Sequence, residues 1–136
     1  MTVKFEEASC LQAFNKMKDS VETWHPEPKA GGNYALWDVT EEETIWVTRT
    51  TPVKKYVDDI KFDFFGNPDD FQVKGCTVKA MSRSQTLSYY DYNTNYCNMW
   101  NVLETVGGAD NQALKDVTTS DCKWVPEDPK TTCAKY

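Results

Sequence analysis

Apolar side chains recur at helical spacing near the start of the chain. Between Cys10 and Trp24 they follow steps of three and four residues, which places them on one face of a helix. Ser9 and Gln12 have the spacing of a capping box, in which the serine caps the first turn and the glutamine reaches back. Two prolines follow and stop the helix. The pattern therefore predicts an amphipathic helix over residues 9–24.

The middle of the chain changes to the alternation that is typical of strands. Residues 34–40 and 44–50 are rich in β-branched and aromatic side chains and flank a run of glutamates, which predicts a hairpin. Residues 60–64 alternate between apolar and charged side chains, as a half-buried strand does. A further β-rich stretch covers residues 71–87.

Helical spacing returns between Tyr96 and Val106, and two glycines then end the pattern. The order helix, four or five strands, helix predicts an α+β fold: an antiparallel sheet with two main helices packed on one face. The 136 residues suit a single domain, with a core over 9–107 and a C-terminal tail over 108–136.

The two helices each carry a tryptophan on the predicted inner face. We expect Trp24 and Trp100 to be core residues that face the strand bearing Ile60, Phe62 and Phe64, because the helical and strand periodicities match.

Charge and composition narrow the classes of partner. Lys and Arg total 15 and Asp and Glu total 21, so the net charge is −6. An acidic surface repels phosphate, which excludes nucleic acid and anionic membrane surfaces as expected partners. No apolar run approaches the roughly 20 residues of a membrane helix, so no membrane insertion is expected.

Cysteine usage favours disulfides over a zinc site, because the five cysteines form no C-x-x-C pair and there is one histidine. We predict a bridge between Cys122 and Cys133, which bracket a polar stretch, and another between Cys76 and Cys97. Cys10 is then left as a buried thiol or as an intermolecular link that would join two chains.

Disulfides point to an extracellular location or to the lumen of the secretory pathway. The first residues lack the apolar segment of a secretory signal, so we expect a mature chain whose signal segment is not in this sequence.

The densest run of polar and aromatic side chains lies just before the second predicted helix. An arginine there could hold an anion in its fork, and tyrosine rings could form the walls of a site. The same residues could instead form a structural hydrogen-bond network that ties the last strand to the helix. The candidate ligand contacts are Arg83, Ser84, Tyr89, Tyr90 and Asp91.

Catalytic and metal chemistry find little support in the sequence. His25 is the lone histidine, and no glycine-rich phosphate loop is present, so no cofactor is predicted. Asp91, Asn93 and Asn95 have the spacing that opens a calcium loop, but Val102 stands where a bidentate glutamate is needed. We therefore predict that no metal binds and that Asp91 has a structural role at the helix start.

The same run resembles the DUF1499 family, a set of small domains of unknown function whose core reads roughly R-S-x-S-R-x-G-x-S-D-x-G-x-N before a helix. An upstream Arg49-Thr50 followed by Val57-Asp58-Asp59 resembles that family's "DD" segment, and the likeness spans about residues 10–106. The resemblance implies a related fold and draws attention to the polar run. The matching residues of the core are Ser82, Ser84, Asp91 and Asn95.

These observations favour a secreted, disulfide-stabilised binding or interaction domain without catalysis, whose ligand is a protein or a small molecule. One alternative is an enzyme or small-ligand carrier with a site in the 82–91 run. Another is a structural subunit of a larger assembly, joined through Cys10.

Overall fold

The order of strands and helices follows the predicted pattern, with one strand added at the start. The computed structural model describes residues 1–41, 43–67, 69–85, 93–108, 111–122 and 124–135. The elements in chain order are β1 (Thr2–Ser9), α1 (Cys10–Thr23), β2 (Asn33–Thr40), β3 (Thr44–Thr50), β4 (Val57–Phe65), β5 (Lys74–Ser84), α2 (Thr94–Glu104), α3 (Gln112–Lys115) and α4 (Pro129–Thr132).

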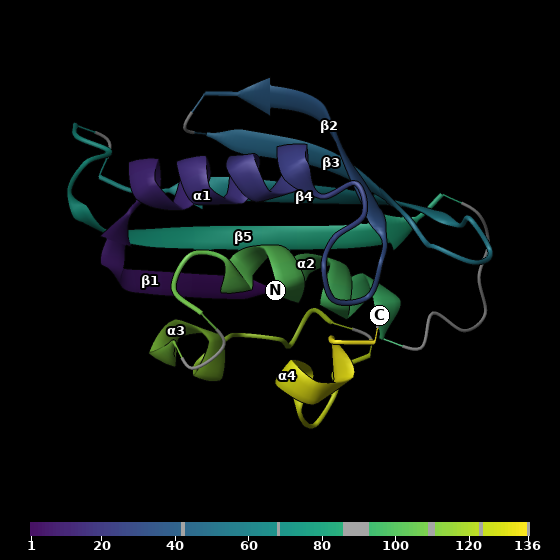
Figure 1. The fold of residues 1–136 in the computed structure, drawn as a ribbon. Helices are drawn as coiled ribbons and strands as arrows, with labels where there is room; N and C mark the ends of the chain where they lie inside the picture. Colours follow the sequence, from purple (N-terminus) through teal and green to yellow (C-terminus); the bar gives the residue numbers. More distant parts are fainter. Residues whose placement is uncertain (42, 68, 86–92, 109–110, 123, 136) are drawn as a thin grey trace.

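Five antiparallel strands form one open sheet in the order β1-β5-β4-β3-β2. Figure 1 shows α1 lying along the sheet and α2 beside it over β5. This arrangement confirms the predicted α+β class. The strand β1 was not predicted, because its alternation of Val3 and Phe5 with Lys4 and Glu6 is short and passes directly into a helix.

The predicted local signals around α1 are confirmed. The Ser9 hydroxyl accepts a hydrogen bond from Gln12 N at 3.1 Å, and Ser9 N donates to Gln12 Oε1 at 3.0 Å, so the capping box is complete. The inner face of α1 then packs on the sheet, where Phe14 meets Phe64 edge to face with ring centroids 5.4 Å apart.

The two predicted core tryptophans differ in their placement. Trp100 on α2 is buried with 2% of its surface exposed, as expected. Trp24 lies one residue beyond α1 at its C-cap, is half-buried, and meets Tyr34 of β2 edge to face at 5.2 Å. It therefore packs against the start of β2 rather than against β4.

The predicted cysteine pairing is wrong. The bridges join Cys10 to Cys76 and Cys97 to Cys133, while Cys122 is free. The prediction paired cysteines that bracket a segment, whereas the fold pairs cysteines on facing elements. Cys10 opens α1 above β5, which carries Cys76, and an intermolecular link through Cys10 is therefore also wrong for this oxidised form.

The second bridge holds the C-terminal tail against α2. Cys97 lies on α2 and Cys133 caps α4, and Asn101 Nδ2 adds a hydrogen bond to the Cys133 carbonyl at 3.2 Å. The tail, with α3 and α4, runs beside α2 and β1 (Figure 1). Among the described residues, no helix combines the length and the apolar character needed to cross a membrane.

Candidate functional site

The strand β5 extends beyond its neighbour β1. β1 pairs with β5 up to Lys79, and Ala80 N then donates to the Met1 carbonyl at 2.8 Å. β5 continues to Ser84 along β4 alone. Among the described strands, the last four residues of β5 therefore have one neighbour rather than two.

The ladder geometry fixes which backbone groups of this free end are unpaired. In an antiparallel pair, successive residues direct their N–H and C=O groups to opposite neighbours. Gln85 N donates to the Val57 carbonyl at 3.0 Å, so the odd-numbered residues of β5 face β4, whereas Ala80 faces β1. By the same alternation, the backbone groups of Ser82 and Ser84 face the side that β1 leaves open.

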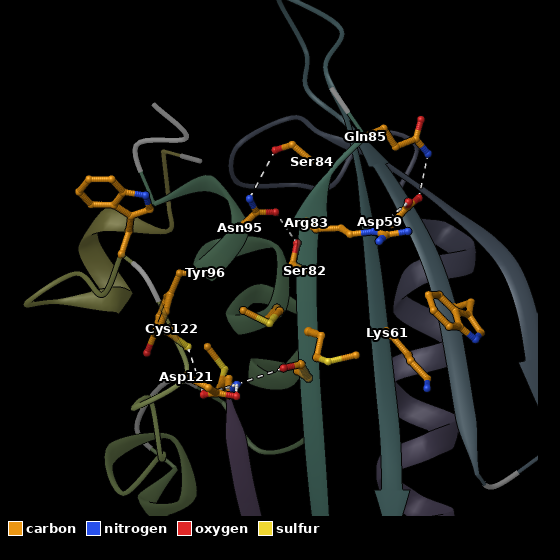
Figure 2. A pocket seen from close by; sticks show the side chains of 16 residues that line it. Asp59, Lys61, Ser82, Arg83, Ser84, Gln85, Asn95, Tyr96, Asp121 and Cys122 are labelled. Atoms are coloured by element: carbon orange, nitrogen blue, oxygen red, sulfur yellow. Dashed lines mark hydrogen bonds and ion pairs between the residues drawn. The ribbon is translucent and has the colours of Figure 1, made fainter. Parts of the chain in front are cut away.

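A groove of about 940 Å³ follows this free end. Figure 2 shows side chains of the sheet on one side of β5 and side chains of α2 and the tail on the other. The outer wall lies on the exposed face of β3, β4 and β5 and consists of Trp46, Asp59, Lys61, Met81 and Arg83. The inner wall comes from α2 and the tail and consists of Asn95, Tyr96, Met99, Asp121, Cys122 and Trp124.

The outer wall presents cations beside an aromatic ring. Lys61 Nζ lies 5.1 Å from the centroid of the Trp46 ring, and Arg83 Nε lies 3.8 Å from Asp59 Oδ2. The Arg83 side chain is 82% exposed, so its ion pair with Asp59 is a weak surface contact. The guanidinium can therefore also contact an anionic group of a ligand.

The inner wall is apolar and largely uncharged. Burial raises the pKa of Tyr96 to about 12, and burial also raises the pKa of the free Cys122 thiol. Asp121 is the exception, because hydrogen bonds from the Met1 amino group at 2.9 Å hold the pKa of its carboxyl below the usual range. Tyr96 and Cys122 therefore meet a ligand as neutral groups at neutral pH rather than as nucleophiles.

A hydrogen-bond network lies behind the groove and ties three strands to α2. Asn98 Nδ2 donates to Asp58 Oδ2 at 2.8 Å and to Ser82 Oγ at 3.2 Å, and Arg49 Nη1 donates to Asn98 Oδ1 at 3.0 Å. Ser82 Oγ donates in turn to Asn95 Oδ1 at 2.6 Å. The side chains that form this network fix the end of β5 relative to α2.

Arg49 is a structural cation of this network. Only 1% of it is exposed, and it sits opposite Asp58 in the β3·β4 register. A Cβ atom on Gly32 would clash with the Arg49 guanidinium, so a larger residue there would displace that buried side chain. The guanidinium carbon lies 5.8 Å from the Tyr34 ring centroid, and Tyr34 Oη donates to the Asn98 carbonyl at 3.1 Å.

The predicted site residues are only partly brought together. Arg83 and Ser84 both line the groove, but as neighbours on a strand they project to opposite faces of the sheet. Ser84 Oγ accepts a long hydrogen bond from Asn95 Nδ2 at 3.5 Å. Tyr89, Tyr90 and Asp91 lie outside the described residues, and so does the predicted structural role of Asp91.

Several groove residues were not foreseen. Trp46, Tyr96 and Trp124 come from three distant parts of the chain, and each looks like an ordinary core or loop aromatic in its local sequence. The one signal in the sequence is the alternation in β3. It places Trp46 on the face of the sheet opposite to the one that carries the buried Ile45 and Val47.

The one histidine and the possible metal-ligating side chains can be placed relative to the groove. His25 lies beyond α1, exposed, with Nε2 2.9 Å from the Glu22 carbonyl, and it does not line the groove. Within the ranges that the structure describes, no three His, Cys, Asp or Glu side chains are grouped as a metal site requires.

Comparison with family models, with curated proteins and with solved structures finds no match to this chain. The resemblance to the DUF1499 family therefore stays a prediction. The resemblance rests in part on Arg49, Asp58, Ser82 and Asn95, and these four residues lie in or beside the hydrogen-bond network described above.

Proposed function

We propose that this chain is a secreted, non-catalytic binding domain and that the groove beside the free end of β5 is its binding site. The observation that carries the proposal is the groove itself, whose volume of about 940 Å³ falls in the range of ligand sites. Two disulfides fit an oxidising compartment, which supports the extracellular part of the proposal.

The chemistry of the two walls describes the ligand. The inner wall offers Tyr96, Met99 and Trp124 to an apolar part, while Lys61 and Arg83 on the outer wall favour an anionic or hydrogen-bond-accepting part. The ligand is therefore amphipathic. The catalytic alternative is less favoured, because the tyrosine and the thiol of the inner wall are held neutral.

The test uses the dye 1-anilinonaphthalene-8-sulfonate, which joins an apolar aromatic body to an anion. We expect saturable binding at one site, with a change in tryptophan fluorescence. We also expect slower alkylation of the Cys122 thiol by iodoacetamide when the dye is bound, because Cys122 lines the groove.

A matched pair of variants locates the binding. Met81→Glu places a negative charge in the groove, where it would repel the sulfonate of the dye, and should weaken dye binding by about tenfold or more. Phe65→Glu makes the same change on the same sheet face, outside the groove, and should leave binding within about twofold. Equal effects of the two variants, or no saturable binding by the native protein, would overturn the proposal.

A further inference from the structure

We infer that the exposed face of the sheet around Trp37 and Trp46 binds a flat, neutral oligosaccharide, a chain of β-1,4-linked pyranose rings. The surface that carries the inference consists of Trp37, Asp38, Trp46, Lys61 and Asp63, and we call it the tryptophan platform. The inference goes beyond the proposed function, because Trp37, Asp38 and Asp63 do not line the groove. The two sites share Trp46 and Lys61.

A β-bulge in β2 places an indole on this face. Leu36 pairs with Val47 and Asp38 pairs with Trp46, so Trp37 is the extra residue of β2 between the two pairs. Bulges re-aim side chains, and this one turns Trp37 toward Trp46. The two rings meet edge to face with their centroids 5.7 Å apart. The bulge therefore gathers two indoles at one place on the exposed face.

The Trp37 ring is presented to solvent rather than packed. It is 70% exposed, whereas Trp46 is half-buried, with Lys61 Nζ 5.1 Å from its ring centroid. The contact with Trp46 orients the exposed ring. The face of an indole carries partial negative charge and attracts the C–H groups that cover the face of a pyranose ring. Trp37 is therefore the ring on which a sugar stacks.

Hydrogen-bonding side chains of both kinds surround the two indoles. Asp38 on β2 and Lys61 on β4 stand on either side of Trp46 in the strand register. Asp63 accepts a hydrogen bond from the Thr44 hydroxyl at 3.1 Å and lies 3.4 Å from Lys61 Nζ. Carboxylates accept hydrogen bonds and ammonium groups donate them, and a sugar hydroxyl can do both. The rim of a stacked sugar ring therefore finds partners here.

The charges of this face balance one another, although the whole chain carries a net charge of −6. Asp59 is paired with Arg83 at 3.8 Å, and Lys79 stands opposite Asp63 in the register. A charged ligand would gain little net attraction, so the face favours a neutral one. The three carboxylates and three cations of the platform and its neighbouring rows are Asp38, Asp59, Asp63, Lys61, Lys79 and Arg83.

The same charges disfavour a protein partner on this face. The cores of protein interfaces are depleted of charged side chains, because covering such groups removes their water. A sugar replaces part of that water with its own hydroxyls and leaves its far side wet. Adjacent strands lie about 4.7–4.9 Å apart, so the row from Trp37 across Trp46 and Lys61 to Met81 spans about 14 Å. A straight β-1,4-linked chain can follow this row.

The probe is cellohexaose, a β-1,4-linked chain of six glucose units. The matched control is maltohexaose, which has the same units and hydroxyls but coils because its links are α-1,4. We expect cellohexaose to bind with a Kd of about 1 mM or below, and maltohexaose at least about tenfold more weakly. Nuclear magnetic resonance should show shifts of the Trp37 and Trp46 indole N–H signals. Equal binding of the two sugars, or no binding of cellohexaose, would overturn the inference.

A matched pair of variants locates the sugar. Trp37→Ala removes the stacking ring and should weaken cellohexaose binding by about tenfold or more. Phe65→Ala removes another exposed aromatic ring from the same sheet face, two rows away from Lys61, and should change binding by less than about twofold. Both side chains are exposed, and circular dichroism establishes that both variants fold. Equal effects of the two variants would contradict the platform.

Salt tests the neutral character of the ligand. Cellohexaose affinity should change by less than about twofold between about 0.05 and 0.5 M sodium chloride, because no net charge is attracted. A larger loss would show that the face recognises charge. Sedimentation of the native chain and of Trp37→Ala tests the other occupant, since a dimer that the variant dissociates would make the platform an interface between two copies.

The dye separates this inference from the proposed function. Trp37→Ala should leave dye binding within about twofold, because Trp37 lies outside the groove. If the dye binds the native protein and cellohexaose does not, the saccharide platform is wrong and the groove stands. If cellohexaose binds and the dye does not, the proposed function fails and the platform stands.

Discussion

The two faces of the sheet are built from the same strands and differ in how their polar groups are satisfied. On the face under α1 and α2, even the buried Arg49 and Asp58 are linked through Asn98. On the uncovered side and along the free end of β5, Arg83 has a weak surface pair and the backbone of Ser82 and Ser84 lacks a partner among the described residues. The buried polar groups are therefore held by contacts within the chain, whereas the exposed Arg83 guanidinium is open to contact from outside it.

The largest contrast between the faces should come from tryptophan truncation. Trp100→Ala empties a buried position under α2 and should lower the free energy of unfolding by about 3–5 kcal/mol. Trp37, which is 70% exposed, is the matched control, and Trp37→Ala should cost less than about 1 kcal/mol. Urea denaturation followed by circular dichroism measures both, and similar losses would remove the distinction between the faces.

The two disulfides should separate stability from binding. Closing loops of 36 and 66 residues stabilises by about 4 kcal/mol each in the chain-entropy treatment. The double variant with Cys97→Ala and Cys133→Ala loses this stabilisation. It also releases the tail residues that form part of the inner wall of the groove, so dye affinity should fall by about tenfold or more.

The control is the pair Cys10→Ala and Cys76→Ala, whose bridge joins α1 to the start of β5, far along the strand from the groove. This double variant should lose a similar amount of unfolding free energy. Its affinity for the dye, measured in conditions where the protein is folded, should equal that of the native protein. Equal loss of dye affinity in both pairs would show that the tail does not form a wall of the site.

Arg49 tests whether the buried cation has a structural role. Arg49→Met keeps most of the volume but removes the buried positive charge that sits opposite Asp58 and donates to Asn98, and it should cost about 3 kcal/mol. Asp58 keeps its hydrogen bond from Asn98, which holds the loss to the lower end of the range for buried ions. Arg83→Met on the exposed face should cost less than about 1 kcal/mol. Thermal melts compare the two, and a larger loss for Arg83→Met would reverse the comparison.

Tyr96 should give the smallest effect, seen only at alkaline pH. Its pKa is about 12 in the folded protein and about 10 when unfolded, so the unfolded state loses its proton first as pH rises. Stability should therefore fall between pH 10 and 12, by about 1 kcal/mol at pH 11 from this residue alone.

Tyr96→Phe should remove that part of the decline, as shown by urea denaturation at pH 8 and pH 11. A remaining decline is expected from Tyr34, whose pKa burial also raises. An unchanged slope in Tyr96→Phe would mean that Tyr96 is not shielded from solvent in the folded protein.

Local patterns predicted most of the fold. The capping box at Ser9 and Gln12, the hairpin of β2 and β3, and the alternation in β4 are all decided by residues close in sequence. The strand β1 escaped prediction because a short alternation has meaning only beside β5. The cysteine pairing failed for the same reason, since facing elements rather than sequence intervals bring sulfur atoms together.

The candidate site was harder to predict than the fold. Arg83 and Ser84 were singled out from a polar run, but the groove depends on where β1 stops relative to β5. The inner wall depends on a tail that reaches α2 through Cys97 and Cys133. Neither the end of a neighbouring strand nor the path of a tail leaves a periodic signal in the sequence.

The bridge between Cys97 and Cys133 also changes what a protease can do to this protein. Lys115 ends α3 at an exposed position, and a cut after it would separate the tail from the rest of the chain in sequence only. The released fragment would remain covalently attached to α2 through the disulfide. A nicked form would therefore keep its groove as a two-chain molecule until a reductant lets the fragment leave.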